Sequence, residues 1–531
     1  MDKRRNRWIR SVSACCVAAG VFACRPAPQP VAPGGGPSLV VLMSIDQLRS
    51  DLLYGYSPVF TGGLRRLLDE GFAFDNATHD HAFTETAPGH HTLSTGVYPS
   101  RSGIVANTWW ERDGDGWKSV YAVEDSDHPI LGYPDLTGRS PANNARTGIA
   151  DWMLAQDPNT RIVAVSRKDR AAIGLAAQAR GEVYWMADRG GEFITSDYYH
   201  DRYPGWVARF NRSEMPGLYA QTEWDSELPP AAAAWTRPDT SRYELDGQHT
   251  AFPHLASDLV DADDPRELNH WRYEFTPFPD AAVLAFSEEA IDELELGQRG
   301  SVDFLGISLS QTDLVGHNFG PMSREQLDNL VKLDRELGAF FDYLDESVGP
   351  GRWVLAFSAD HGVLDIPEQL ADDGVPAARL GRADRDRFIA TIRSVEADGP
   401  EAVKRAIEQL PFVAAAYTFD EIESGQAADS FAVLYAHSHS RTRAPQLSAR
   451  WGVYTRFREN TLIWGSNRAT HGSPYRYDRD VPIVFLGAGV AQGRSSEAVA
   501  TVDLAPTLAR LAGVTVPDDL DGHVLESALS P

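Results

Sequence analysis

Cysteine is almost absent from this chain of 531 residues, which contains Cys15, Cys16, Cys24 and no others. Because no cysteine follows Cys24, the rest of the chain has no disulfide and no thiolate metal ligand. A metal site in this chain must therefore be built from aspartate, glutamate and histidine.

Long apolar runs are absent after the first 25 residues, so no transmembrane helix is expected there. Before that point, a basic segment ending at Arg10 precedes the short apolar segment Ser11 to Ala23, as in an export signal. The sequence Val-Phe-Ala-Cys that ends at Cys24 resembles a bacterial lipoprotein cleavage box. We therefore predict a signal peptide over 1–23 and a Pro- and Gly-rich lipid-anchor tether over 24–38.

The predicted location follows from this N-terminal segment. We expect an exported protein of the periplasm or cell surface, held to the membrane by a lipid on Cys24. The alternative is an ordinary signal peptide that is cleaved nearby without lipidation.

Positive charge is also scarce: 49 Lys and Arg stand against 75 Asp and Glu, for a formal net charge of −26. Such an acidic chain is unsuited to non-specific binding of nucleic acid, so no nucleic-acid partner is predicted. An anionic substrate would need local cations to attract it against the overall field. Nothing in the sequence indicates an oligomeric state.

Five apolar runs have the composition of strands buried in a sheet. They are Ser38–Ile45, Arg161–Ser166, Val302–Ser308, Trp353–Phe357 and Pro482–Leu486. Helical periodicity appears between them, most clearly after Ser323, where apolar residues recur every three or four positions. This alternation predicts an α/β fold with a mostly parallel central sheet flanked by helices.

Two stretches interrupt the alternation and are predicted to be insertions that form a cap. They span about 181–300 and about 363–464, within a domain that covers 39–531. The first stretch becomes irregular and rich in Pro, Trp and Tyr.

Polar residues with metal-binding side chains follow three of the predicted strands. Asp46 follows the first, and Asp360 with His361 follows the fourth. Asp313 and His317 follow the third and are four residues apart, so one helical turn would project both to the same side. Strand ends of this kind carry the ligands in open α/β sheets.

The stretch Thr84 to His90 supplies a candidate nucleophile, Thr86, at the start of a predicted helix. A threonine hydroxyl needs a base or a metal to activate it at neutral pH. Singly, each residue has an ordinary explanation, such as a helix N-cap for an aspartate. Their joint occurrence favours a metal site, for which oxygen and imidazole ligands suit zinc, and manganese or iron less selectively. The candidate ligands are Asp46, Thr86, Asp313, His317, Asp360, His361 and His471.

Together these motifs resemble the alkaline phosphatase superfamily. The set comprises Ser44-Ile-Asp46, Thr86-Ala-Pro-Gly-His90, Asp313-x-x-x-His317, Asp360-His361-Gly362 and Thr470-His471-Gly472. The pattern is similar to that of phosphate-irrepressible alkaline phosphatases with a threonine nucleophile, which are neighbours of the nucleotide pyrophosphatase/phosphodiesterases. The resemblance covers about 39–531 and the motifs occur in the family's order.

The resemblance implies two Zn²⁺ ions per chain. One would be held by Asp46, Thr86, Asp360 and His361, and the other by Asp313, His317 and His471. Two such ions clamp the attacking and leaving oxygens of an in-line displacement. The implied reaction is hydrolysis of small phosphate monoesters through a phosphothreonine at Thr86, with release of inorganic phosphate.

Three further residues are implied to bind the substrate. Asn107 is placed to donate a hydrogen bond to a non-bridging oxygen, while Lys168 and Arg170 match the family's Ser-x-Lys-x-Arg element. A monoester dianion has one more charged oxygen than a diester, which Lys plus Arg favour. As an alternative, these two residues form a solvated helix start.

Other functions remain as alternatives. A phosphodiesterase or nucleotide pyrophosphatase would use the same metals, but Lys168 and Arg170 argue against it. A sulfatase would need a modified Cys or Ser where this chain has Thr86, and an arginine where it has His90. A non-catalytic, surface-anchored binding lipoprotein would be expected to have lost ligands, and none of the set is missing.

Overall fold

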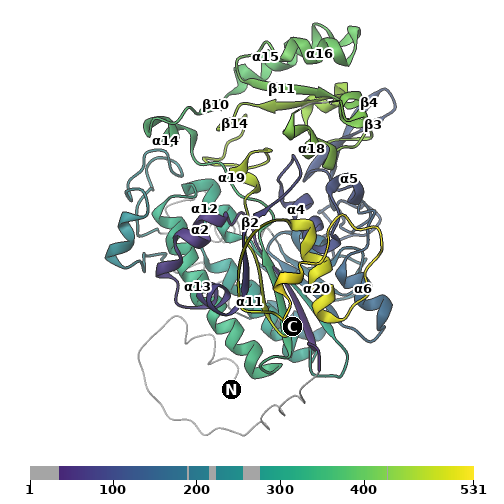
Figure 1. The fold of residues 1–531 in the computed structure, drawn as a ribbon, viewed down its shortest axis with the longest axis vertical. Coiled ribbons are helices and arrows are strands. Elements are labelled where there is room, and N and C mark those ends of the chain that lie inside the picture. The colour runs from purple at the N-terminus through teal and green to yellow at the C-terminus, as the bar shows by residue number, and fades with distance from the viewer. Residues whose placement is uncertain (1–34, 188–190, 214–222, 255–274, 427–428) are drawn as a thin grey trace.

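A nine-stranded sheet forms the centre of the molecule (Figure 1). The structure is a computed structural model and describes residues 35–187, 191–213, 223–254, 275–426 and 429–531. The signal peptide predicted over 1–23 and most of the tether predicted over 24–38 lie outside the described residues. The strand order is β16 (Gly493–Ala500), β2 (Phe72–Thr78), β15 (Ile483–Gly487), β9 (Trp353–Ser358), β1 (Leu39–Ile45), β8 (Asp303–Leu309), β5 (Ile162–Ser166), β6 (Glu182–Met186) and β7 (Phe193–Ile194).

Most neighbouring strands in this sheet are parallel. The pairs β1–β8, β1–β9, β5–β8, β5–β6 and β2–β16 are parallel, whereas β15 is antiparallel to β2 and β9, and β7 is antiparallel to β6. The predicted α/β fold with a mostly parallel sheet is therefore confirmed.

Helices cover both faces of the sheet. Along β1, residues 39, 41, 43 and 45 face one core and residues 40 and 42 face the other, which explains the unbroken apolar run. The first face is covered by α2 (Ser50–Gly55), α3 (Gly63–Glu70), α8 (Gly205–Asn211), α11 (Phe278–Glu293) and α13 (Arg324–Ser347). The second face is covered by α4 (Thr86–Thr95), α6 (Ile149–Gln156), α7 (Asp169–Ala176) and α20 (Leu504–Ala512).

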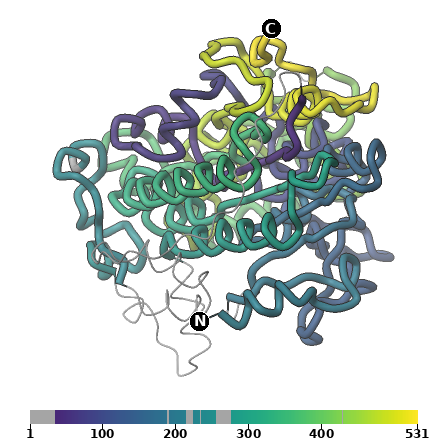
Figure 2. Tube along the Cα trace, turned by 90° about the horizontal axis from the view of Figure 1, so that it is seen from below, coloured from purple at the N-terminus to yellow at the C-terminus, as the bar shows by residue number. Residues whose placement is uncertain are grey.

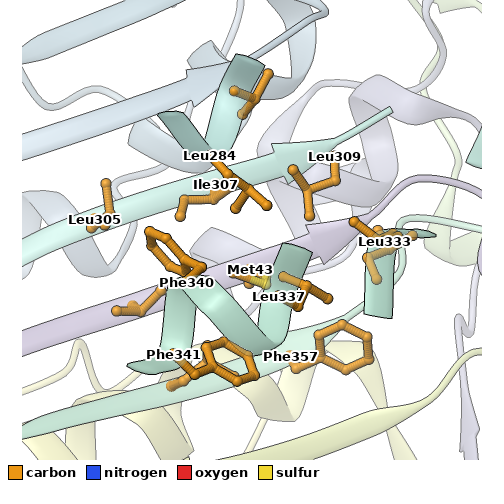
Figure 3. Packing of buried hydrophobic residues seen from close by; sticks show 14 of the residues in the cluster. Met43, Leu284, Leu305, Ile307, Leu309, Leu333, Leu337, Phe340, Phe341 and Phe357 are labelled. Atoms are coloured by element: carbon orange, nitrogen blue, oxygen red, sulfur yellow. The ribbon is translucent and has the colours of Figure 1, made fainter. Parts of the chain in front are cut away.

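Helix α13 shows how the sequence pattern becomes packing. Ser323 caps its start by accepting a hydrogen bond from the Gln326 backbone N–H. The apolar positions that recur every three or four residues, among them Leu333, Leu337 and Phe340, all face the first core (Figure 3). Figure 2 shows α13 lying alongside α11, and the two helices together close this face of the sheet.

The second predicted insertion forms a separate layer, the cap, at the top of Figure 1. It packs around two small apolar cores of its own. The cap helices are α14 (Pro367–Asp372), α15 (Arg382–Arg393), α16 (Pro400–Ile407), α17 (Phe419–Ser424) and α18 (Ser430–His437). The cap strands are β10 (Ala378–Leu380), β11 (Val413–Thr418), β12 (Arg443–Ala444), β13 (Val453–Phe457) and β14 (Thr461–Ile463).

A hairpin from outside the predicted insertions joins the cap. Strands β3 (Thr108–Asp113) and β4 (Gly116–Tyr121) pair with each other, and β3 also pairs with β12 of the cap. The hairpin therefore connects the cap to α4, the helix with Thr86. Between the sheet and the cap lie α12 (Gln311–Phe319), α5 (Pro99–Ser102) and α19 (Arg476–Arg479).

The structure differs from the prediction at the first insertion, expected over about 181–300. Strands β6 and β7 are part of the central sheet, and α11 packs on one of its faces. Any insertion is therefore confined to residues between α8 and α11, because β6, β7 and α8 all belong to the central sheet or to the helices that cover it. No helix within the described residues has both the length and the apolar composition to cross a bilayer.

Candidate active site

Three strand ends meet at one edge of the sheet. Strands β1, β8 and β9 are adjacent and parallel, and their last residues lie in register. Asp46, Asp313 and Asp360 therefore follow them at the same edge, as the sequence predicted. All three side chains are buried.

Thr86 lies at the N-terminus of α4, next to this edge. Its side chain is buried, and Arg170 Nη2 lies 3.4 Å from the Thr86 Oγ1. The first turn of a helix presents unpaired N–H groups and positive partial charge, which favour an anion beside the hydroxyl. This position suits a nucleophile that attacks a phosphoryl group.

Helix α4 is held against the end of β9 by a close approach. A Cβ on Gly89 would lie 2.2 Å from the backbone oxygen of Asp360, so no larger residue fits there. His90, one helical turn after Thr86, makes two further contacts. Its Nδ1 lies 3.2 Å from Asp360 Oδ2, and its Nε2 lies 2.9 Å from the Ser308 hydroxyl. These contacts fix Thr86 relative to the carboxylates.

Asp46, Asp360 and His361 form a first group able to hold a metal ion. His361 Nε2 lies 3.4 Å from Asp46 Oδ1 and 3.4 Å from Asp360 Oδ2. All three of these atoms are buried and have no hydrogen-bond partner among the described residues. Buried polar atoms without partners are costly, so three that converge fit a cation as their common partner.

Asp313, His361 and His471 form a second such group. His471 Nε2 lies 3.6 Å from Asp313 Oδ1, and the rings of His361 and His471 stack with centroids 3.5 Å apart. His317 Nε2 lies 3.1 Å from the same Asp313 oxygen. The structure thus brings six of the seven predicted ligands together, with His361 shared between the two groups, while Thr86 lies on the neighbouring helix α4.

The three histidines are oriented alike. In His317, His361 and His471, the Nδ1 atom lies 2.7–2.9 Å from a backbone carbonyl oxygen. Each ring therefore donates from Nδ1 and directs the lone pair of Nε2 at a carboxylate. A histidine that ligates a metal has this arrangement, because the second nitrogen fixes the tautomer.

Crowding of the carboxylates shifts their ionisation. Burial and the nearby Asp360 raise the pKa of Asp46 well above its ordinary value. Burial also opposes ionisation of Asp313 and Asp360, but neighbouring histidines and Lys168 outweigh it and hold both pKa values well below the usual range. Burial lowers the pKa of His361 and His471, whereas for His317 the neighbouring Asp313 outweighs burial and raises the pKa. Ionised carboxylates and neutral imidazoles are the forms that bind a metal.

Lys168 lies between the two groups. Its ammonium contacts Asp46 Oδ2 and lies 2.6 Å from Asp313 Oδ2. It follows β5, the neighbour of β8, and its buried position excludes the solvated helix start considered from the sequence. The structure places this cation on the carboxylates and does not place it beside Thr86.

Asn107 and Arg170 flank Thr86. The Asn107 Oδ1 accepts a hydrogen bond of 2.7 Å from the Ala87 backbone N–H, which turns the amide NH₂ away from the helix. Arg170 Nη1 lies 3.3 Å from the Tyr121 hydroxyl, and the Arg170 Nε has no partner among the described residues. Both side chains thus retain donors for a bound oxyanion.

Sequence reasoning missed several residues that support this site. Gln47 donates from its backbone to Asp360 and, at 2.5 Å, from Nε2 to Asp313 Oδ1. Its adjacency to Asp46 is a signal that the sequence offered. The sequence also offered a signal for His90, since it lies one helical turn after Thr86. It offered no signal for Tyr121, because the contact of Tyr121 with Arg170 depends on the β3–β4 hairpin.

Four other histidine and tryptophan residues near Thr86 in the sequence lie apart from the metal-binding groups. His79 Nε2 and His91 Nδ1 contact backbone oxygens, and neither histidine belongs to the two groups found in the described residues. Trp109 is buried against Ala87, while Trp110 packs against the cap.

Comparison with known proteins shows which family this chain is similar to. The family model described as type I phosphodiesterase / nucleotide pyrophosphatase matches residues 40–459. The sequence is 30% identical over 528 residues to the alkaline phosphatase PhoV of Synechococcus elongatus, covering 93% of each chain. It is also 30% identical over 532 residues to the alkaline phosphatase PafA of Elizabethkingia meningoseptica, covering 93% of this chain and 94% of that one.

The similarity extends to three dimensions. The crystal structure of wild-type alkaline phosphatase PafA superposes with a TM-score of 0.85 at 28% identity, covering 94% of this chain and 100% of that chain. The shared architecture includes both the sheet and the cap, since nearly all of each chain is aligned.

Proposed function

The chain belongs to the type I phosphodiesterase / nucleotide pyrophosphatase family of the alkaline phosphatase superfamily and is a hydrolase, and from this premise we propose that it hydrolyses phosphate monoesters through a phosphothreonine at Thr86. The observation that carries the proposal is the position of Thr86. Its buried hydroxyl lies at a helix N-terminus beside Arg170, next to converging carboxylate and imidazole atoms, three of which have no hydrogen-bond partner among the described residues.

The reaction has two displacements at phosphorus. The Thr86 Oγ attacks, a P–O bond forms to threonine, and the bond to the ester oxygen breaks, releasing an alcohol after protonation. Water then attacks the phosphothreonine, and the threonine oxygen leaves with release of inorganic phosphate. Each displacement needs mainly positioning and stabilisation of charge on the phosphoryl oxygens.

The residues of the chain supply much of this stabilisation. Arg170 and the amide NH₂ of Asn107 donate to non-bridging oxygens, and the first turn of α4 adds the Thr86 backbone N–H and its positive partial charge. The predicted ligands Asp46, Thr86, Asp313, His317, Asp360, His361 and His471 would hold zinc ions, which would supply Lewis-acid stabilisation of the reacting oxygens. With such counter-charge for Asp46 and Asp313, the Lys168 ammonium would be available to the phosphoryl group.

The preference for monoesters rests on Lys168 and Arg170. Two cations beside one phosphoryl group favour the dianion of a monoester over the single charge of a diester. The second candidate function is a phosphodiesterase or nucleotide pyrophosphatase with the same metals, which the name of the matching family model favours. The non-catalytic binding protein is disfavoured because every ligand and the nucleophile are present.

The direct test is to trap the intermediate. Zinc-loaded wild-type protein, mixed with an aryl phosphate monoester and quenched in acid, should contain one phosphorylated residue, Thr86, by peptide mass spectrometry. Thr86→Ala should show neither the modification nor turnover of a monoester or diester. Turnover at wild-type rate in Thr86→Ala would rule out threonine as the nucleophile.

The location of the protein remains as predicted from the sequence: exported, with a lipid on Cys24 that anchors it in the periplasm or at the cell surface. The basic segment, the short apolar segment and the tether support this proposal. Mass spectrometry of the native N-terminus tests it. An unmodified start downstream of Cys24 would exclude the anchor.

A further inference from the structure

A cavity of about 340 Å³ lies on the cap, between the β3–β4 hairpin and the 3₁₀ helix η5 (Leu447–Trp451). Its lining includes Arg112 and Trp117 from the hairpin and Arg450 and Trp451 from η5. None of these residues takes part in the site described above. The size falls within the range of pockets that hold small ligands.

Arginine and tryptophan side chains are stacked around this cavity. The Arg112 guanidinium lies 4.3 Å from the ring centre of Trp117. The Arg450 guanidinium lies 5.4–5.9 Å from the ring centres of Trp110, Trp117 and Trp451. Stacking fixes each guanidinium plane and leaves its N–H edge to bind an oxyanion.

These arginines are not neutralised by the protein. Among the described residues, Arg112, Arg393 and Arg450 have no carboxylate within ion-pair distance, in a chain of net charge −26. Burial, with Arg112 and Arg393 nearby, lowers the pKa of Arg450. Arg441, which also lines the cavity, is paired with Glu423 and Asp420.

The cavity also contains an acid. Glu396 lines it and accepts a hydrogen bond of 2.6 Å from Trp451 Nε1. That bond holds the Glu396 carboxylate on the indole, and no ion pair joins it to the three arginines among the described residues. Within the described part of the chain, the guanidinium groups of Arg112 and Arg450 therefore have no carboxylate as an ion-pair partner.

One face of the hairpin links this cavity to the active site. Tyr121 pairs with Thr108, Ser119 with Trp110, and Trp117 with Arg112, so all six side chains lie on the same face. At one end, the Tyr121 hydroxyl contacts Arg170 beside Thr86. Thr108 and Ser119 on this face are exposed, whereas Trp110 packs against the cap. Tyr121 and Trp117 are four positions apart along β4, a span of about 13 Å.

We propose that this arginine–tryptophan cavity binds a second oxyanion of the substrate, so that the preferred substrates are extended phosphate monoesters with another phosphate or carboxylate at the far end of this hairpin face, about 13 Å from Tyr121. The inference rests on the proposed monoesterase, whose phosphoryl site fixes the near end of the ligand. The tryptophan faces are occupied by guanidinium groups, so the cavity recognises charge at the far end and not an aromatic ring.

The test uses two phosphoserine peptides. One has glutamate at the fourth position on each side of the phosphoserine, and the other has glutamine there. We expect kcat/KM of the wild-type enzyme to be about tenfold higher for the glutamate peptide, equivalent to about 1.4 kcal/mol. The double variant Arg112→Gln/Arg450→Gln should bring this ratio close to one. A ratio taken within each enzyme cancels any general loss of folded protein.

Arg382→Gln provides the matched control. Arg382 is an exposed cap arginine away from the cavity, with its side chain 94% exposed, so its loss removes a cap cation without touching the cavity and should leave the ratio intact. Equal rates on both peptides with the wild type, or a ratio that survives in the double variant, would overturn the inference.

A binding measurement separates this inference from the proposed function. Calorimetry with Thr86→Ala protein should give a Kd about tenfold lower for the glutamate peptide, whether or not the wild type turns over. A wild type that releases no phosphate while this difference persists would refute the monoesterase and retain the anion site. Equal Kd values would refute the anion site alone.

Discussion

Gln47 connects the two groups of metal ligands, because its backbone N–H donates to Asp360 and its side chain to Asp313. Hydrogen-bond partners of metal ligands typically affect metal affinity or activity 10- to 100-fold. We therefore expect Gln47→Ala to lower kcat/KM by about 10- to 100-fold at limiting zinc. Gln178→Ala, which removes a side-chain hydrogen bond to Asn144 away from the site, is the control. Equal zinc titration curves for both variants would exclude a positioning role for Gln47.

Glu244 is a buried acid with an unusual ionisation. Both its carboxylate oxygens lack a hydrogen-bond partner among the described residues. Burial, and then Glu325, raise the pKa of Glu244 to about 9. Because the folded state then binds a proton that the unfolded state has lost, the unfolding free energy falls as pH rises from the unfolded pKa of about 4 toward 9.

Glu244→Gln removes this titration. Relative to wild type, the variant should gain stability from about pH 5 to about pH 8, by at most about 1.4 kcal/mol per pH unit. Urea unfolding of metal-saturated protein measures the difference, and Glu497→Gln, an exposed change on β16, should show none of it. A difference between Glu244→Gln and wild type that is constant with pH would contradict the assigned pKa.

At this scale, the sequence was most informative about charged residues that follow strands. Asp46, Asp313 and Asp360 could be predicted because a strand end fixes where its next residue lies. Gln47 and Tyr121 could not, since a neutral side chain gains its role from partners distant in sequence. The Lys168 contact with two carboxylates also depends on the register of β5 and β8, which no local pattern reveals.

The packing of helix α4 against the end of β9 is the element-scale feature on which the nucleophile depends. Alanine in a helix is ordinarily favoured over glycine by about 1 kcal/mol. At Gly89, however, a Cβ would lie 2.2 Å from the Asp360 carbonyl oxygen, so this clash makes alanine destabilising there. We expect Gly89→Ala to cost about 1–3 kcal/mol and to lower activity by displacing Asp360.

A matched glycine provides the control for this change. Gly55 is the last residue of α2, and a Cβ at this position would have no atom within 4 Å. Gly55→Ala should therefore be neutral or slightly stabilising. Denaturant unfolding and aryl phosphate turnover should be measured on both variants. Wild-type stability and rate in Gly89→Ala would show that α4 can shift without disturbing the site.

Elements with a strong period were predictable, and those defined by pairing were not. The apolar run of β1 and the helical pattern of α13 each determine their structure locally. Strand β7 has two residues, too few to show a period, so the sequence did not show that β6 and β7 form the edge of the central sheet. The β3–β4 hairpin was not assigned to the cap, because its pairing with β12 joins positions more than 300 residues apart.

For the molecule as a whole, metal binding should couple to stability. The buried carboxylates of Asp46, Asp313 and Asp360 need a counter-charge, and a ligand present at 1,000 times its Kd adds about 4 kcal/mol. Elemental analysis should find about two zinc ions per chain. Removal by a chelator should abolish activity and lower Tm, and zinc should restore both. An active protein with one metal or none would contradict the two-ion site.

The central claim is that the whole enzyme selects monoesters through Lys168 and Arg170. The most direct measurement is kcat/KM for an aryl phosphate and its methyl diester, on wild type and on Lys168→Ala/Arg170→Ala. Each charge-assisted contact contributes about 1.5–3 kcal/mol, so the monoester rate should fall about a hundredfold or more. The diester rate should fall much less, because a diester lacks the second charge. If both rates fall by the same factor, the pair supports the site without reading the substrate, and the monoesterase assignment fails in favour of the diesterase.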